Sequence, residues 1–145
     1  MFKEKEFSLK IIVPASTSNL GPGFDTLGLA VNRYLVMEAE PSPEFSIEIT
    51  GEGAGEIPLD DRNLTVYAMR KILGRTPDLK IKVHNGIPAC GGFGASGAAI
   101  AAGLLLGNEL AAKKLGIGDI YSIGVEIEGH PDNVSAALFG GLIVN

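Results

Sequence analysis

The chain has 145 residues, of which 46% are hydrophobic and 20% are charged, a composition typical of a globular protein with one core. A net charge of -5, from 12 Lys+Arg against 17 Asp+Glu, argues against a nucleic-acid partner, because binding to a phosphate backbone needs a positive field. The single cysteine, Cys90, forms no internal disulfide, and the longest small apolar run, Ala98 to Gly107, is about half a membrane span, so we expect a cytoplasmic protein with no membrane partner.

The first half of the chain predicts β-strands. Residues 7–13, 45–49 and 79–83 alternate between apolar and polar side chains, which is typical of strands with one buried and one wet face. A fourth stretch, residues 27–40, has the same character but is interrupted near Asn32. It predicts either two strands or one bent strand.

Helical spacing appears later in the chain. Asn63 is a candidate N-cap for a helix that ends near Gly74, and residues 96–115 predict a longer helix buried on several sides. A third helix is expected over residues 119–128, and a fourth begins at Pro131, which suits the first helical position.

The last apolar run, Leu142–Val144, resembles a strand. Strands come mostly first and helices later, so the fold class expected is α+β, with a mixed or mostly antiparallel sheet and helices packed on one face. No internal repeat divides the chain, and we expect residues 1–145 to form one domain.

A glycine-rich loop precedes the longest predicted helix. Its glycines Gly92, Gly94 and Gly97 match the G-x-G-x-x-G pattern of dinucleotide-binding folds. In those folds the glycines follow the strand almost at once, whereas here the strand ends near His84, and no strand-like run leads to an acidic residue at the expected distance. A Walker A loop is also excluded, because the first lysine after the loop is Lys113.

Two interpretations of the loop remain: a turn that lets a helix pack closely, or a phosphate cradle. Five glycines between Gly86 and Gly97 cost more backbone entropy than packing alone usually demands. The loop also leads Ser96 into the first turn of a helix, where free amides attract anions and a hydroxyl can ligate Mg²⁺.

Two polar segments flank this loop in the sequence. Residues 13–34 carry Asn19 and Asp25, which either stabilise turns or form part of a substrate loop. Residues 126–141 are either a capped helix start or a second part of the site, in which one carboxylate pairs with the Ser96 hydroxyl around a metal ion.

Together, the segments VPASTSNLGPGFDTLGLAV, IPACGGFGASGAA and EGHPDNVSAALFGG resemble, in the expected order, the GHMP small-molecule kinases and, within that family, the homoserine kinase branch. The resemblance implies the GHMP kinase N-terminal domain, with the fold of ribosomal protein S5 domain 2, over residues 1–145, and a C-terminal domain absent from this chain. It implies ATP-dependent phosphorylation of the side-chain hydroxyl of L-homoserine, a step toward threonine, with ATP and Mg²⁺ as cofactors.

The resemblance also implies residue roles. The ATP phosphates would be wrapped by a loop comprising Pro88, Ala89, Cys90, Gly91, Gly92, Phe93, Gly94, Ala95, Ser96, Gly97 and Ala98. Mg²⁺ would be held by Ser96 and Glu128, with Glu126 as the alternative glutamate. The amino acid would be held by Asn19, Asp25 and Asn133, in a pocket shaped by His130 and Asp132, while Asn63 would reach the adenine side. No general base is implied.

The sequence departs from the family pattern in two ways. Family loops usually read Gly-Leu-Gly-Ser-Ser-Ala, whereas here Ala95 lacks the first serine hydroxyl. Homoserine kinases are also about twice as long, so we expect this chain alone to bind nucleotide weakly and to be inactive. Two alternatives stay open: another GHMP kinase, of the pantoate, shikimate or mevalonate type, or a non-catalytic binding domain. Uncovered apolar surface at residues 142–144 would favour a homodimer.

Overall fold

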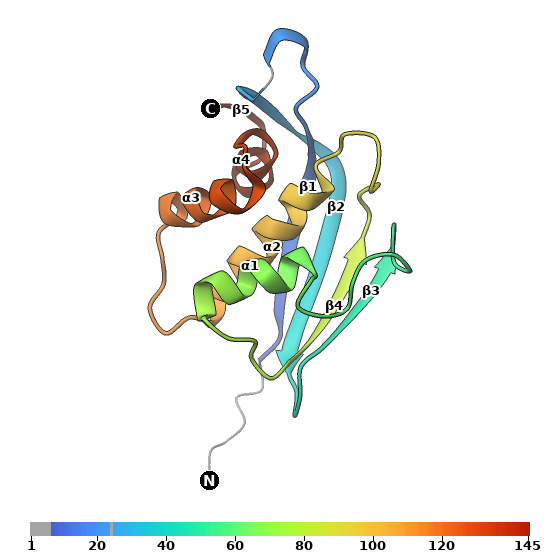
Figure 1. Cartoon of the computed structure of the whole chain (residues 1–145), viewed down its shortest axis with the longest axis vertical. Coiled ribbons are helices and arrows are strands. Elements are labelled where there is room, and N and C mark those ends of the chain that lie inside the picture. The colour runs from blue at the N-terminus through green and yellow to red at the C-terminus, as the bar shows by residue number, and fades with distance from the viewer. Residues whose placement is uncertain (1–6, 24) are drawn as a thin grey trace.

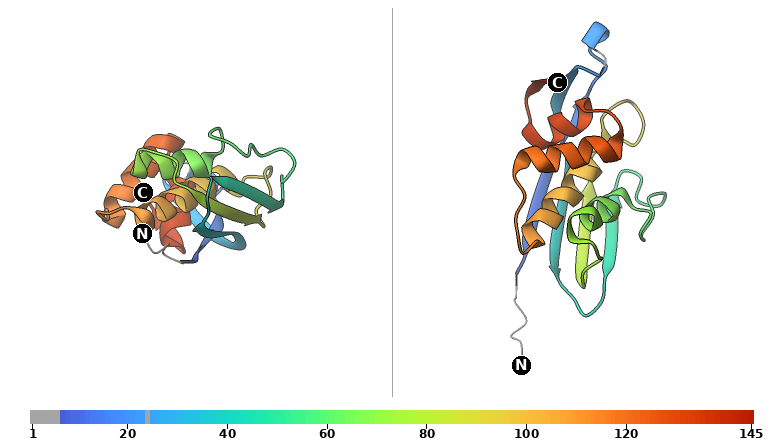
Figure 2. Two further views of the ribbon diagram at one scale, coloured as in Figure 1. Left: turned by 90° about the horizontal axis from the view of Figure 1, so that it is seen from below. Right: turned by 60° about the vertical axis from the view of Figure 1, so that its left-hand side comes forward.

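The computed structural model describes residues 7–23 and 25–145. Within them, a five-stranded sheet carries all four α-helices on one face (Figures 1 and 2). The elements in chain order are β1 (Leu9–Thr17), the short 3₁₀ turn η1 (Gly21–Gly23), β2 (Leu27–Pro41), β3 (Ser46–Gly51), α1 (Leu64–Leu73), β4 (Leu79–Asn85), α2 (Ala95–Leu110), α3 (Ile117–Glu128), α4 (Asp132–Phe139) and β5 (Leu142–Val144).

The sheet is mixed and mostly antiparallel, as the sequence predicts. Its strand order is β1-β2-β4-β3, and β5 pairs with the first residues of β2. β2 runs antiparallel to β1, β4 and β5, whereas β3 and β4 are parallel and are therefore joined by a crossover through α1. The α+β class is confirmed.

The interrupted stretch of residues 27–40 forms one long strand with an irregularity. Along β1, Pro14 pairs with Tyr34 and the next residue, Ala15, pairs with Val31, so two residues of β2 have no partner there. Proline has no amide hydrogen to donate to a ladder, which explains why the irregularity falls at this point. Beyond it, β1 continues toward the glycine-rich loop.

The core lies between the sheet and the helices. Alternate residues of β1, β2 and β4 are fully buried beneath α1 and α2, among them Val13, Met37 and Ile81. The opposite face of the sheet carries cross-strand ion pairs, such as Lys10–Glu38 at 3.8 Å. No helix in residues 7–23 or 25–145 is both long and apolar enough to cross a membrane.

Glycines inside α2 allow α1 to pack closely on it. A Cβ at Gly103 would overlap the Thr65 carbonyl oxygen, and one at Gly107 would lie 2.9 Å from the Met69 carbonyl oxygen. The helix ends at Leu110, so the predicted end at Leu115 is wrong. There the Asn108 side chain accepts the amide hydrogen of Leu115 at 2.7 Å. This local hydrogen bond closes a loop over residues whose sequence pattern predicts a continued helix.

Candidate functional site

The glycine-rich loop owes its shape to residues with positive φ. Gly91, Gly92 and Gly94 have φ values of 105°, 72° and 67°, a region that residues with a side chain rarely adopt. A Cβ at Gly94 would also overlap the Ser16 hydroxyl and lie 2.8 Å from Asn133 Nδ2. Glycine is therefore required here by conformation and by close approach, whereas those inside α2 serve packing.

The loop delivers free amides at the start of α2. The first hydrogen bond of the helix joins the Ala98 amide to the Gly94 carbonyl oxygen at 3.0 Å, so the amides of Ala95, Ser96 and Gly97 have no acceptor within the helix. No acidic residue occupies this first turn. The amides and the positive end of a 16-residue helix dipole fit a phosphate group.

A serine and a glutamate meet beside these amides. Ser96 Oγ donates to Glu128 Oε1 at 2.7 Å, and the Glu128 side chain is only 10% exposed. Glu128 is the last residue of α3, and Glu126, two positions earlier, is exposed on another side of that helix. Of the two candidate glutamates, Glu128 is the one next to Ser96, and this pair of oxygen atoms fits Mg²⁺.

The start of α4 holds a buried carboxylate against a histidine. Asp132 is 2% exposed, and its Oδ1 lies 2.8 Å from His130 Nδ1 and accepts the Asn133 amide hydrogen at 2.9 Å. The hydrogen bond that His130 donates to the Asp132 carboxylate raises the pKa of His130 above its ordinary value; burial opposes this effect, and the charges of Asp132, Glu128 and Asp25 add to it. Pro131 is the N-cap of α4, so the helix begins at Asp132, one position after the start that the sequence predicts.

Asn19 and Asp25, the candidates from the loop after β1, lie close to the glycine loop and to His130, respectively. Asp25 has a φ of 58° and, with His130 and Asp132, offers ligand atoms that all lie within 4.8 Å of one another. A Cβ at Gly92 would lie 2.6 Å from Asn19 Nδ2, so the Asn19 amide lies against the loop.

A polar cavity of about 340 Å³ joins most of these groups; Asp25 and Asp132 do not line it but lie beside it, next to His130. Its wall is made by the loop residues 92–96 and by Ser18, Asn19, Ala89, Glu128, His130 and Asn133. The three polar sequence segments therefore form one site, which sequence spacing alone could not establish.

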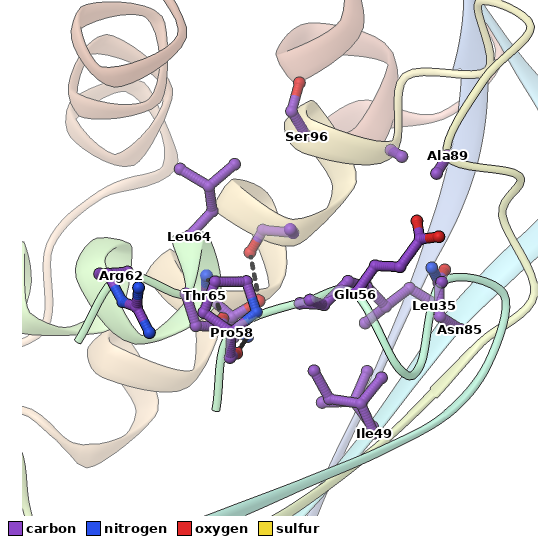
Figure 3. Close-up of a pocket in the computed structure, with 16 residues that line it drawn as sticks. Leu35, Ile49, Glu56, Pro58, Arg62, Leu64, Thr65, Asn85, Ala89 and Ser96 are labelled. Carbon is purple, nitrogen blue, oxygen red and sulfur yellow. Dashed lines mark hydrogen bonds between the residues drawn. The ribbon is translucent and has the colours of Figure 1, made fainter. Parts of the chain in front are cut away.

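A second cavity, of about 310 Å³, lies on the other side of the loop and is mainly apolar (Figure 3). The two cavities share Ala89, Ala95 and Ser96. Asn63 lines the apolar cavity, but its Oδ1 caps α1 through the amides of Thr65 at 2.9 Å and Val66 at 3.4 Å. Its contact with adenine stays a prediction.

Sequence reasoning missed Ser16 and the apolar cavity. Ser16 is 1% exposed; its amide donates to the Phe93 carbonyl oxygen at 2.9 Å, and its hydroxyl to the Asn133 carbonyl oxygen at 3.5 Å. It thus connects β1, the glycine loop and α4. Strand alternation gave no signal for Ser16, because it is out of phase with the inward-facing Val13 and Ala15 of β1. No signal in the sequence indicated the apolar cavity either, because its walls include residues from separate strands and a turn.

This combination of a glycine loop, a helix start with free amides and an adjacent polar cavity is chemically suited to a phosphate group. Residues 63–141 match the GHMP kinases N terminal domain. The chain therefore belongs to the GHMP kinase family.

Two curated proteins similar to this chain are named homoserine kinases. The homoserine kinase of Corynebacterium kroppenstedtii is 43% identical over 143 residues, covering 95% of this chain and 46% of that protein. The homoserine kinase of Moorella thermoacetica is 42% identical over 137 residues, covering 92% of this chain and 46% of that protein. The chain thus spans about half the length of the curated relatives it matches.

Solved structures agree. A Listeria monocytogenes protein provisionally assigned as a homoserine kinase is 39% identical, with a TM-score of 0.83 over 93% of this chain and 48% of its own. The homoserine kinase of Cytophaga hutchinsonii is 27% identical, with a TM-score of 0.78 over 99% of this chain and 50% of its own. The Methanococcus jannaschii mevalonate kinase, 15% identical with a TM-score of 0.68 over 94% of this chain and 52% of its own, shares the fold alone.

Proposed function

We propose that this chain is the ATP-binding part of an enzyme that phosphorylates the side-chain hydroxyl of L-homoserine, releasing ADP and O-phospho-L-homoserine. The observation that carries the proposal is the junction of the glycine loop with Asn19, His130 and Asn133 in one polar cavity. Relatives above 40% identity that are named homoserine kinases support the choice of substrate.

The nucleotide would lie across the glycine loop. Adenine would enter the apolar cavity, and its phosphates would bind the free amides of residues 95–97 together with the rest of the loop, residues 88–98. Ser96 and Glu128 would hold Mg²⁺, which neutralises charge on the transferred phosphoryl group. The apolar and polar cavities meet at Ala95 and Ser96, so the γ-phosphate would reach the polar side.

The amino acid would lie in the polar cavity. The protonated imidazole of His130 would attract the substrate carboxylate, and Asp132 keeps that ring oriented and basic. Asp25 offers a carboxylate for the substrate ammonium group, and the amides of Asn19 and Asn133 would complete the contacts. We assign no general base, because positioning and charge neutralisation supply most of the acceleration in phosphoryl transfer.

A substrate panel tests this proposal. The full-length protein is mixed with ATP, Mg²⁺ and homoserine, pantoate, shikimate or mevalonate, and ADP release is followed by a coupled assay. We expect the highest kcat/KM with homoserine and little ADP without an alcohol. ADP release with another alcohol, together with none above background for homoserine, would contradict the proposal.

Three wider expectations belong to the same proposal. The chain would be the N-terminal domain of a two-domain enzyme, inactive when it is isolated as these 145 residues. The enzyme would work in the cytoplasm. Exposed apolar side chains, Leu142 at 61% and Val144 at 71%, favour a homodimer of this chain, and light scattering at high concentration tests that, since a clean monomer would contradict it.

A further inference from the structure

Most polar side chains of the apolar cavity are already bonded to the protein itself. Asn63 caps α1, and Thr65 Oγ1 donates to the Ala99 carbonyl oxygen at 3.1 Å. Asn85 donates from Nδ2 to the Glu52 carbonyl oxygen and accepts the Ile87 amide hydrogen, both at 3.0 Å. These groups shape the cavity, but they have little hydrogen-bonding capacity left for a ligand.

Two charged side chains also line the cavity, and only one of them is already paired with another side chain of the described residues. Arg62 is held by Asp60, with Arg62 Nη2 2.8 Å from Asp60 Oδ2. The Glu56 carboxylate, by contrast, has no hydrogen bond or ion pair with any side chain or amide in residues 7–23 and 25–145. Glu56 is therefore the charged group that lines the cavity and is free to receive a ligand.

The position of Glu56 is set by a tight turn. The amides of Glu56 and Ile57 both donate to the Gly53 carbonyl oxygen, at 2.9 and 3.1 Å. A Cβ at Gly53, whose φ is 69°, would lie 4.0 Å from the Ala89 Cβ, so this turn packs next to the glycine loop. In Figure 3 the Glu56 carboxylate extends toward Ala89, on the glycine-loop side of Ile49.

Of the base, the ribose and the phosphates of a nucleotide, the ribose is the part that suits the Glu56 carboxylate. Phosphates would repel a carboxylate, and the apolar interior of the cavity is suited to the flat base. Between base and phosphates lies the ribose, whose 2′ and 3′ hydroxyls are donors, and an ionised carboxylate only accepts. Glu56 is also exposed, as a group that contacts a partly solvated sugar should be.

We propose that Glu56 binds the ribose hydroxyls of the nucleotide and so makes the site select ribonucleotides over deoxyribonucleotides. This inference rests on the proposed function, because it requires that a nucleotide occupies the apolar cavity. It adds a specificity-determining residue outside the three polar segments that carry the rest of the site.

Nucleotide binding tests the inference without reference to turnover. Calorimetry on the full-length protein compares ATP with 2′,3′-dideoxy-ATP, both with Mg²⁺, for the wild type, Glu56→Ala and Glu56→Gln. Glu52→Gln is the matched control, since Glu52 lies on the same segment but does not line the cavity. We expect the wild type and the control to bind ATP about tenfold more tightly than the dideoxy analogue, the magnitude expected for hydrogen bonds to a charged group near solvent.

In Glu56→Ala, the expected ratio falls to within about twofold, through weaker binding of ATP alone. Glu56→Gln should keep part of the preference, because its amide oxygen still accepts a hydrogen bond. The inference is overturned if Glu56→Ala keeps the full ratio, weakens both analogues equally, or changes the preference for ATP over GTP instead. A wild type that binds ATP without preferring the ribose form overturns this inference alone, whereas one that binds no ATP overturns the proposed function with it.

Discussion

Ser96 Oγ and Glu128 Oε1 lie 2.7 Å apart, although 32 positions separate the two residues in the sequence. Ser96 stands in the first turn of α2, and Glu128 is the last residue of α3. Their hydrogen bond therefore connects the glycine loop to the segment that holds His130 and Asp132. A proposed phosphate cradle and a proposed substrate pocket meet at this pair.

The first prediction concerns the metal site. Glu128→Gln is expected to lower kcat about 100-fold and to raise the Mg²⁺ concentration needed for half-maximal rate, because an amide is a poorer metal ligand than a carboxylate. Glu126→Gln is the matched control on the same helix and should stay within about twofold of the wild type, since Glu126 is exposed. A larger loss of kcat in Glu126→Gln than in Glu128→Gln would contradict the assignment of the metal to Glu128.

The second prediction concerns the missing hydroxyl of the glycine loop. Ala95 borders both cavities and stands at the first position of α2. Ala95→Ser adds a donor beside the proposed phosphate site, so the KM for ATP should fall by about two- to fivefold, as for one added hydrogen bond. An unchanged KM, with the fold intact by circular dichroism, would mean that the backbone amides already satisfy the phosphates.

The third prediction separates glycines that are needed from those that are not. Gly94→Ala places a side chain at a φ of 67° and against Ser16, so it should lower the free energy of unfolding by about 2 kcal/mol and weaken ATP binding. Gly118→Ala, at a helical position with no atom within 4 Å of the added Cβ, should be neutral or stabilising by up to about 1 kcal/mol. Urea unfolding measures both, and equal effects would contradict this account of the loop.

The fourth prediction concerns pH. The hydrogen bond that His130 donates to Asp132 raises the pKa of His130 above 6.5. The stability that this bond contributes is therefore fully present below pH 6.5 and is lost as the pH rises through the folded-state pKa. An NMR titration of the His130 ring should report the raised pKa, and Asp132→Asn should move it back toward 6.5. A His130 pKa that is the same in both proteins would remove Asp132 as the cause.

The sequence predicted elements well where the signals are local. The helix from Asn63 to Gly74 is confirmed: α1 is capped by the Asn63 side chain and ends at Gly74 with a φ of 73°. The predicted helix end at Leu115 is wrong because a side-chain contact decides it: Asn108 Oδ1 accepts the Leu115 amide hydrogen, and α2 stops at Leu110. The sequence left open whether residues 27–40 form two strands or one bent strand; they form one strand, whose two extra residues are accommodated opposite Pro14.

The site could be predicted where its functional residues lie together in short sequence motifs. The glycine loop, His130 and Asp132 stand out as residue types, but the contact of Ser96 with Glu128 depends on how α3 packs across α2. The apolar cavity was not predictable, because Leu35, Ile49 and Val83 come from three different strands and read as ordinary core residues. Glu56 lies on a turn, and a binding role for it can be inferred only from its position at that cavity.

The most direct test of the proposed function is the identity of the product. The full-length protein is incubated with ATP, Mg²⁺ and L-homoserine, and the mixture is followed by ³¹P NMR and mass spectrometry. The account predicts a new phosphate monoester on the side-chain oxygen of homoserine that forms at the same rate as ADP, and that forms about 100-fold more slowly in Glu128→Gln. ADP that appears with inorganic phosphate alone, and with no phosphorylated homoserine, would contradict it.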